Sequence, residues 1–312
     1  HSYTTLMSNT SFAPNIEINL NTTSDSDSSA DTSSNVSING TYPVFIYENG
    51  TLANITFIPV YPGWGFGLGG FGGTLGNIGR SFYENFDQKE YNAVKRIEAK
   101  TKHDVNAVVG YLSQKLEKNG YSNLVPFIHF GLTSEDVNNT SYSLMFKRGI
   151  DGPLLESLNQ LSSLLVLLVR KTKDMPMLSL THGQPATTTT LGKEIAVFHN
   201  RLERQITYIK KHIMLAKFSG ATGTFAAHKI AFPKESWTGF SDKFIREMGL
   251  KNNPITTQIE PNDSIAELLH AFVRINNILT DMCVDIWLYI SRNIFTQTNK
   301  AGEVGSSTKN IP

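Results

Sequence analysis

Short polar clusters rich in histidine, serine, threonine and glutamine carry the side chains of this chain that could do chemistry. Imidazole can hold a proton near pH 7 and release it, which suits general acid–base catalysis. Hydroxyl and amide groups in loops can converge on a ligand without costly burial. The clusters are residues 101–104, 133–136, 181–186, 256–261 and 305–308. Each is weak by itself, because a lone histidine beside a loop is more often a surface or capping residue.

Apolar residues at helical spacing separate these clusters and predict the elements that must position them. The clearest stripe lies within residues 262–298, where Ser264 and Glu267 predict a capping box at the helix start. Two further stripes run through residues 191–213 and after Pro153, a residue typical of the first helical position. Such helices pack as bundles. The sequence therefore predicts an all-α, long-helix bundle with the polar clusters in the loops between helices.

Residues 1–80 differ sharply in composition from residues 81–312, and we treat the two as separate segments. The first is rich in Ser, Thr, Asn and Gly and has too little apolar content to build a core, which predicts a largely disordered, low-complexity segment. A weak hairpin is predicted around the turn-prone Asn49-Gly50. A G-x-G-x-x-G match at residues 65–70 follows from glycine content, because no βαβ pattern surrounds it.

Bulk composition argues against several classes of function. The net charge is +1 over 312 residues without a basic block, so nucleic-acid binding is not expected. The longest purely apolar run, residues 164–169, is too short to cross a bilayer, so no membrane association is expected. The single cysteine, Cys283, is expected to be a buried thiol, and no metal-ligand spacing appears. A cytoplasmic location is expected; N-glycosylation sequons in the first segment leave a secreted alternative.

Together and in this order, the clusters resemble the adenylosuccinate lyases of the fumarase/aspartase superfamily over roughly residues 84–308. The resemblance is most specific at residues 179–187, which read SLTHGQPAT, and at residues 256–263, which read TTQIEPND. FGLTSED at residues 130–136 and KFSGATG at residues 217–223 add support. The Gly-Gln-Pro-Ala continuation after Thr-His favours adenylosuccinate lyases over relatives that cleave argininosuccinate, malate or aspartate.

This resemblance implies a β-elimination of fumarate from adenylosuccinate, giving AMP, and from the succinylated carboxamide ribotide, giving AICAR. It implies that His182 is the general acid and that Ser306 is the general base, on a mobile loop that closes over the substrate. The residues that it assigns to substrate binding are His103, Asp104, Thr133, Ser134, Lys217, Gln258, Ser307 and Lys309. Structural alternatives stay open, since Ser134 and Asp136 also suit helix capping and Lys217 suits a solvated helix-end lysine.

The resemblance further implies a homotetramer whose sites take residues from three subunits, with a succinylated purine nucleotide as the partner and no cofactor or metal. The superfamily signature Ser-Ser-x-Met-Pro-x-Lys-x-Asn is replaced here by SSTKNIP at residues 306–312, so that Lys309 is out of register. The family's N-terminal domain and later helices are also missing from the sequence. We therefore expect a truncated core with a partly uncovered apolar stripe, and we do not expect catalysis by the chain as written. The alternatives are an inactive helical oligomerisation scaffold and an extracellular glycoprotein.

Overall fold

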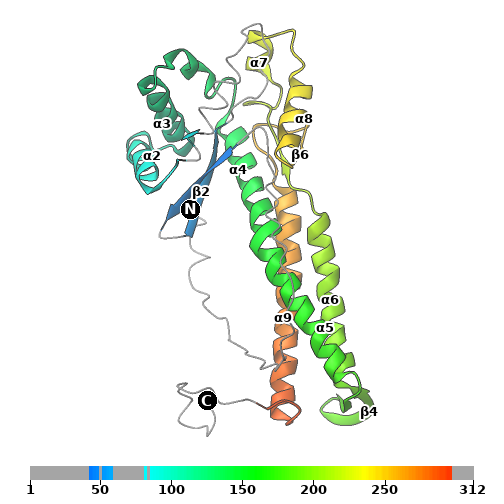
Figure 1. The fold of residues 1–312 in the computed structure, drawn as a ribbon. Helices are drawn as coiled ribbons and strands as arrows, with labels where there is room; N and C mark the ends of the chain where they lie inside the picture. The colour runs from blue at the N-terminus through cyan, green and yellow to red at the C-terminus, as the bar shows by residue number, and fades with distance from the viewer. Residues whose placement is uncertain (1–41, 49–50, 59–80, 83–84, 297–312) are drawn as a thin grey trace, which may run out of the picture. The chain divides into compact units, whose positions relative to one another are not determined.

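The structure is a computed structural model that describes residues 42–48, 51–58, 81–82 and 85–296, the first two ranges by their backbone alone (Figure 1). The helices are α2 (Gln88–Thr101), α3 (Asp104–Lys118), α4 (Ser134–Gly149), α5 (Leu155–Thr172), α6 (Leu191–Lys211), α7 (Ala226–Ala231), α8 (Trp237–Glu247) and α9 (Asp263–Ser291), with a 3₁₀ turn η1 (Ser122–Phe127) and a π turn η2 (Ile150–Leu154). The strands are β1 (Tyr42–Glu48), β2 (Thr51–Ile58), β3 (Pro176–Thr181), β4 (Gln184–Thr190), β5 (Leu215–Ala216) and β6 (Lys251–Asn252).

The predicted hairpin in the first segment is confirmed at the level of the backbone. Strands β1 and β2 pair antiparallel, with Tyr42 opposite Ile58 and Glu48 opposite Thr51. Residues 22–41, predicted to be disordered, and the dinucleotide match at residues 65–70 lie outside the described residues, and glycosylation stays a prediction.

Helices α2 and α3 and the turn η1 form a small helical group with its own core. Asp87 begins α2 by accepting hydrogen bonds from the backbone N–H groups of Lys89 and Glu90 at 2.8 and 3.0 Å. These bonds satisfy donors that a helix start otherwise leaves without partners. The buried residues of this group are Tyr91, Val94, Ala107, Val108, Tyr111, Leu112, Leu116, Leu124 and Ile128.

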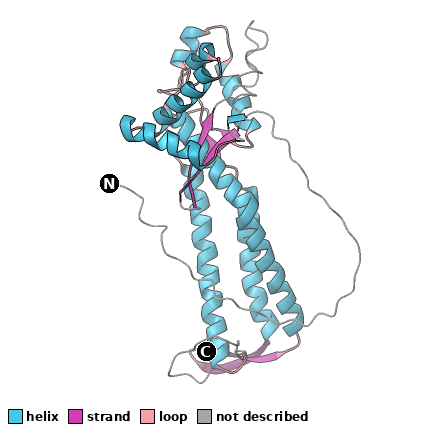
Figure 2. Cartoon of the chain, turned by 60° about the vertical axis from the view of Figure 1, so that its left-hand side comes forward, coloured by secondary structure: helices cyan, strands magenta, loops and turns pink. Residues whose placement is uncertain are grey.

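The long helices α5, α6 and α9 run beside one another and carry most of the remaining core, as Figures 1 and 2 show. The chain reaches α5 from α4 through the π turn, where Gly152 leaves the helical region (φ −94°, ψ −106°). Pro153 follows directly after this kink, which agrees with its prediction as a helix-start residue, although α5 proper begins at Leu155. The predicted helical bundle is therefore confirmed.

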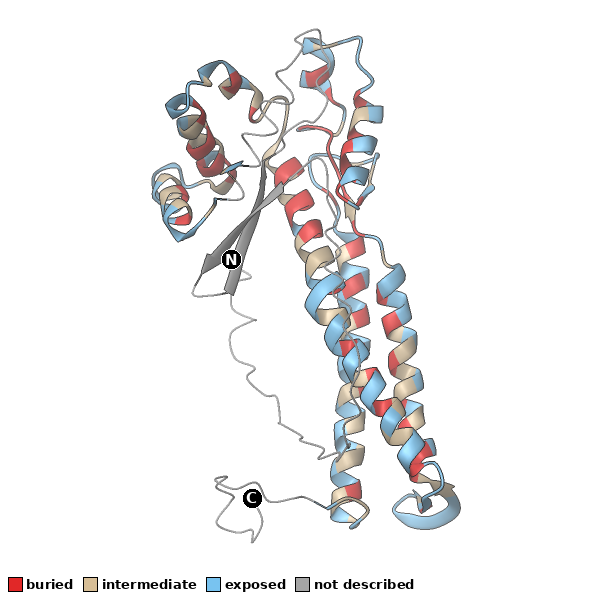
Figure 3. Cartoon of the chain, viewed as in Figure 1, coloured by how far each residue is buried: buried red, intermediate tan, exposed pale blue. Residues whose placement is uncertain are grey.

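The stripes predicted from the sequence face the core (Figure 3). On α6, the side chains at successive turns are buried, and Leu202 has no exposed surface. On α9, Leu268 is equally inaccessible and Ile275 and Tyr289 are buried. The burial of these stripes supplies the apolar area that stabilises the bundle, at roughly 25 cal/mol per Å².

Some sequence-based expectations were wrong. No capping box forms at the start of α9, because the Ser264 hydroxyl instead accepts the backbone N–H of Leu215 at 3.1 Å and Asn262 ends the preceding loop in the left-handed region. Cys283 is exposed rather than buried. The stretch around His182 is a β-hairpin rather than an irregular loop, as described below.

The predicted stripe on α9 is partly uncovered, since Phe272, Leu279 and Met282 are only partly buried, and a second apolar face of the long helices is exposed as well. Val273 is 55% exposed, Trp287 67% and, on α5, Leu164 52%. Among the described residues, the run Ser134–Thr172 also meets a length and hydropathy criterion for crossing a membrane, with 17% of its most apolar window buried. Core helices of soluble bundles reach the same length and hydropathy. Large exposed apolar faces are typical of surfaces that bind another chain.

Candidate functional site

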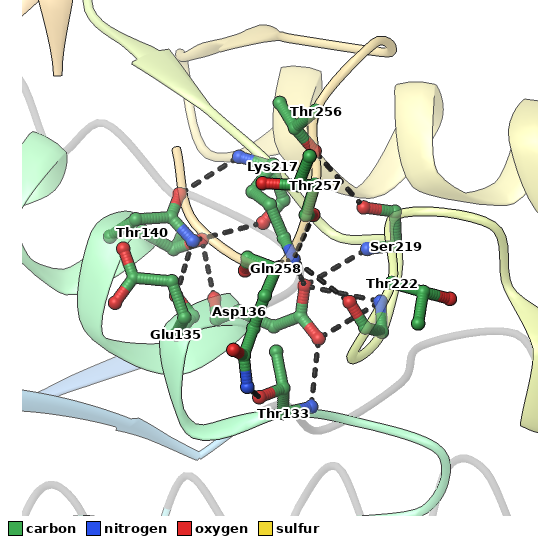
Figure 4. A network of polar contacts seen from close by, with 12 residues as sticks. Thr133, Glu135, Asp136, Thr140, Lys217, Ser219, Thr222, Thr256, Thr257 and Gln258 are labelled. Carbon is green, nitrogen blue, oxygen red and sulfur yellow. Dashed lines mark hydrogen bonds and ion pairs between the residues drawn. The ribbon is translucent and has the colours of Figure 1, made fainter. Parts of the chain in front are cut away.

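Two of the sequence-predicted clusters and the motif at residues 217–223 converge where α4 begins (Figure 4). Residues 133–136 begin α4, residues 217–220 follow β5, and residues 256–258 form the loop between β6 and α9. Helix α4 supplies a rigid platform, and the other two clusters are loops held against it. The geometry of this polar region is set by the contacts among the three.

A buried ion pair lies at the centre of the region. Lys217 Nζ is 3.1 Å from Asp136 Oδ1, and neither side chain has any exposed surface. The Asp136 carboxylate also accepts the backbone N–H groups of Thr133 (2.9 Å), Ser219 (2.9 Å) and Gly220 (3.0 Å). Such a set of donors offsets much of the desolvation cost of a buried carboxylate.

The ammonium of Lys217 reaches the 256–258 loop as well. Its Nζ donates to the backbone carbonyls of Gly220 at 2.9 Å, Gln258 at 2.6 Å and Thr257 at 3.4 Å. The prediction of a solvated helix-end lysine is therefore wrong. The prediction that Lys217 pairs with substrate is corrected too, because its charge is enclosed by protein groups and cannot touch a ligand. In this structure Lys217 joins the backbone of its own loop, at Gly220, to the backbone of the 256–258 loop.

Close backbone packing joins two of the loops. Gly223 has a positive φ of 74°, and a Cβ atom on it would lie 2.1 Å from the carbonyl oxygen of Thr256. Only glycine allows this approach, because real Cβ atoms do not come so near to a backbone oxygen. The backbone of the loop after β5 therefore lies directly against the backbone of the 256–258 loop.

Thr133 and Gln258 are the predicted binding residues that meet at the surface of this region. Gln258 Nε2 donates to Thr133 Oγ1 at 3.3 Å. Thr133 is the N-cap residue of α4, and Asp136 caps its backbone N–H, so the capping role proposed for Ser134 belongs to Thr133 instead. Nearby, partial burial raises the pKa of Glu135, while a hydrogen bond from the backbone of Glu260 opposes the rise.

His103, Asp104 and Ser134 form a neighbouring group in which the starts of two helices meet. His103 is the N-cap of α3, and its Nε2 lies 3.4 Å from the hydroxyl of Ser134 in the first turn of α4. Its Nδ1 lies 3.2 Å from Asp104 Oδ1. Nδ1 also accepts the backbone N–H of Asn106 at 3.4 Å, so in the neutral ring the proton lies on Nε2 and is donated to the Ser134 hydroxyl. All three side chains remain partly exposed and are open to a ligand.

His182 lies at the tip of the β3–β4 hairpin. Thr181 and Gln184 close this hairpin, and the two residues between them both have positive φ, 51° for His182 and 72° for Gly183. This is the geometry of a two-residue turn that matches the twist of the strands. A non-glycine residue in the left-handed region costs roughly 1–2 kcal/mol. The strained turn presents the imidazole to solvent, since His182 is exposed.

Among the described residues, the structure does not bring His182 to the other predicted site residues within one chain. Helix α6 begins directly after β4 and spans 21 residues before the chain reaches Lys217. At about 1.5 Å per residue, this helix separates the two ends by roughly 30 Å. Ser306, Ser307 and Lys309 lie outside the described residues, so their predicted roles stay predictions.

The sequence profile of a lyase family matches residues 78–309. The chain belongs to this lyase family. The described helices and the polar clusters all lie within the matched residues, and the β1–β2 hairpin lies before them. The predicted relationship to the fumarase/aspartase superfamily is therefore confirmed.

Within this lyase family, the chain is similar to adenylosuccinate lyases. It is 45% identical over 235 residues to that of Dictyostelium discoideum and 44% identical over 225 residues to that of Escherichia coli strain K12. The alignments cover 73% and 72% of this chain but 50% and 49% of the relatives. The chain thus spans about half the length of the curated relatives it matches.

Two solved structures show the same fold at low sequence identity. A fumarate lyase from Mesorhizobium sp. BNC1 matches with a TM-score of 0.57 and 19% identity over 70% of this chain and 49% of its own. A 3-carboxy-cis,cis-muconate lactonizing enzyme from Pseudomonas putida matches with a TM-score of 0.58 and 20% identity over 71% and 48%. These likenesses support the bundle architecture.

Sequence reasoning missed a buried polar face on α4. Asn139 pairs with both backbone groups of Lys217, accepting its N–H at 2.8 Å and donating to its carbonyl at 3.2 Å. Asp136, Asn139, Thr140 and Ser143 are all buried. Their spacing of three and four residues was the available signal, because it lines one face of a helix. Among the described residues, no group of three or more metal-ligating side chains gathers.

Proposed function

We propose that the chain carries the core of an adenylosuccinate lyase that releases fumarate from adenylosuccinate and from the succinylated carboxamide ribotide. The observation that carries this proposal is the convergence of His103, Thr133, Ser134 and Gln258, within the region that is similar to adenylosuccinate lyases. Helices α3 and α4 both begin there, and a helix N-terminus favours a bound anion. A substrate with two carboxylates and a phosphate suits such a site.

The proposed reaction is a β-elimination. A base removes a proton from the succinyl carbon next to the carbon bonded to nitrogen, and the electron pair forms the new C=C bond. The C–N bond breaks, and an acid gives its proton to the departing amine. Ser306 is the proposed base and His182 the proposed acid, because imidazole can hold and release a proton near pH 7.

Substrate binding is assigned to hydroxyl, amide and imidazole groups in the converged region. The Thr133 hydroxyl accepts a hydrogen bond from Gln258, so its own proton is free for a carboxylate oxygen of the substrate. His103 and Ser134 are proposed to contact the reacting part of the substrate, with Asp104 beside them. Ser307 and Lys309 are proposed to bind the carboxylate whose negative charge grows in the transition state.

A site of this kind needs more than one copy of the chain. Helix α6 keeps His182 far from the residues that it must join, so we propose that His182 of one copy completes the binding region of another in a homotetramer. The exposed apolar face with Val273 and Trp287 supports this assembly. The second candidate function, an inactive oligomerisation scaffold, is favoured by the altered signature residues 306–312.

Fumarate release from adenylosuccinate by the full chain, followed by absorbance, tests the proposal. His182→Asn is the informative variant, because asparagine tolerates a left-handed turn and keeps the hairpin. Where the unsubstituted chain releases fumarate, His182→Asn should lower kcat about 10²- to 10⁴-fold, the usual contribution of a general acid. The same substitution at the exposed His270 is the control and should leave kcat unchanged. Substrate binding without turnover by the unsubstituted chain would favour the scaffold, and equal rates for both variants would remove His182 from the mechanism.

A further inference from the structure

We infer that the buried Asp136–Lys217 pair is the positioning element of this site, which sets Gln258 against Thr133 without touching the ligand. The identity of the substrate in this inference rests on the proposed function, whereas the geometry rests on the contacts alone. One end of the pair, Asp136, accepts the backbone N–H of Thr133 at 2.9 Å. The other, Lys217, donates to the backbone carbonyl of Gln258 at 2.6 Å. The side chains of the same two residues meet at the surface.

The 256–258 loop depends on such contacts because it has no regular secondary structure of its own. Backbone pairing ends where Asn253 N–H donates to the Ala216 carbonyl at 2.8 Å. Glu260, which is 2% exposed, turns inward and accepts from the Asn253 amide at 2.9 Å and the Asn262 N–H at 2.6 Å. Between these anchors, the ammonium of Lys217 is the group that holds the loop's carbonyls.

An ammonium suits this place better than a neutral side chain. Its three N–H donors match the three backbone carbonyls of Gly220, Thr257 and Gln258, and its charge faces the Asp136 carboxylate. The protein also gains less stability from such a pair than its Coulomb attraction indicates, because both ions lose their hydration. The pair is therefore better explained by the fixed geometry that it imposes on two loops and the start of α4 than by stability.

The consequence for ligand binding follows from the hydroxyl of Thr133. Gln258 Nε2 occupies one acceptor position of this hydroxyl, which directs the hydroxyl proton toward a ligand oxygen. A shift of the 256–258 loop would remove this orientation while leaving the residues present. Asp136 and Lys217 therefore act as positioning residues for substrate affinity rather than as catalytic residues.

The test separates positioning from simple stability. We would compare Lys217→Met, Asp136→Asn and the neutral double variant Asp136→Asn/Lys217→Gln with the full wild-type chain, measuring Tm, KM and kcat for adenylosuccinate. Lys115→Met is the matched control, because it breaks a partly exposed Lys–Glu pair in the α2–α3 group. We expect KM to rise about tenfold in all three site variants, the effect of one lost oriented hydrogen bond, with a smaller change in kcat. In the double variant Tm should recover while KM stays raised.

Recovery of KM together with Tm in the double variant would overturn the inference in favour of a structural role alone. Hydrogen exchange supplies a readout that needs neither turnover nor a folded variant. In the wild-type chain, the amides of Thr133, Ser219 and Gly220 should exchange slowly, because each donates to buried Asp136. Fast exchange at these amides would overturn the inference. A chain that neither binds nor cleaves adenylosuccinate but keeps this protection would refute the proposed function and leave the positioning geometry standing.

Discussion

Gly223 and Gly249 share a positive φ of 74° but have different surroundings, which makes them a matched pair for testing the loop packing at the site. A Cβ on Gly223 would lie 2.1 Å from the backbone oxygen of Thr256 and 2.9 Å from that of Thr257. A Cβ on Gly249 would meet the Cε of Lys147 at 2.9 Å, which is the movable end of a long side chain. Both variants therefore force an alanine into the left-handed region of backbone conformation, and Gly223→Ala also displaces the backbone of the 256–258 loop.

The magnitude follows from these two contributions. Alanine in the left-handed region costs about 1–2 kcal/mol, and this cost applies to both variants. Overpacking against groups that cannot move aside costs a further 1–3 kcal/mol or so. We therefore expect Gly223→Ala to lower the free energy of unfolding by about 1–3 kcal/mol more than Gly249→Ala does.

Urea unfolding followed by circular dichroism measures this difference. Because Gly223 fixes the 256–258 loop, Gly223→Ala should also raise KM for adenylosuccinate, whereas Gly249→Ala should not. Equal losses of stability in the two variants would refute the argument, since they would mean that the loop yields without cost.

Other predictions concern pH, helix capping and assembly. Burial lowers the pKa of His228, against the raising influence of Asp136 and of the backbone of Phe130. The unfolded chain therefore binds this proton more readily, so the free energy of unfolding falls as the pH drops below about 6.5. His228→Gln should flatten the fall in Tm between pH 7 and 5. An unchanged dependence of Tm on pH would contradict this cause. Asp87→Ala should lower the unfolding free energy of the α2–α3 group by about 1 kcal/mol, measured by hydrogen exchange, and no change would argue against the cap. Trp287→Glu should shift the oligomer toward smaller species in light scattering, whereas an unaltered mass would exclude that face from the interface.

The long helices were predictable because their apolar side chains repeat at helical spacing along the chain. Leu202 and Leu268 lie on those stripes and are fully buried. The hairpin that carries His182 was not predicted, because its strands are mostly exposed and lack an alternating apolar pattern. Its one visible signal was the His-Gly pair, which suits a two-residue turn.

The site was predictable in its residue types but not in its pairing. Thr133 and Gln258 were identified from the family resemblance, and the structure brings them together. The role predicted for Lys217 was wrong, because its partner Asp136 lies far away in the sequence, on α4, and such a contact leaves no local sequence pattern. The capping box at Ser264 failed for the same reason, since its hydroxyl bonds to the distant Leu215.

The central claim is that His182 of one copy completes a binding region formed by another copy, and complementation tests it most directly. His182→Asn and Gln258→Leu would each be purified, shown to release little fumarate from adenylosuccinate, and then mixed under conditions that exchange subunits. The mixture should recover turnover, because some sites receive both intact residues. If the wild-type chain is active and the mixture stays as inactive as its components, the site lies within single chains and the account is contradicted.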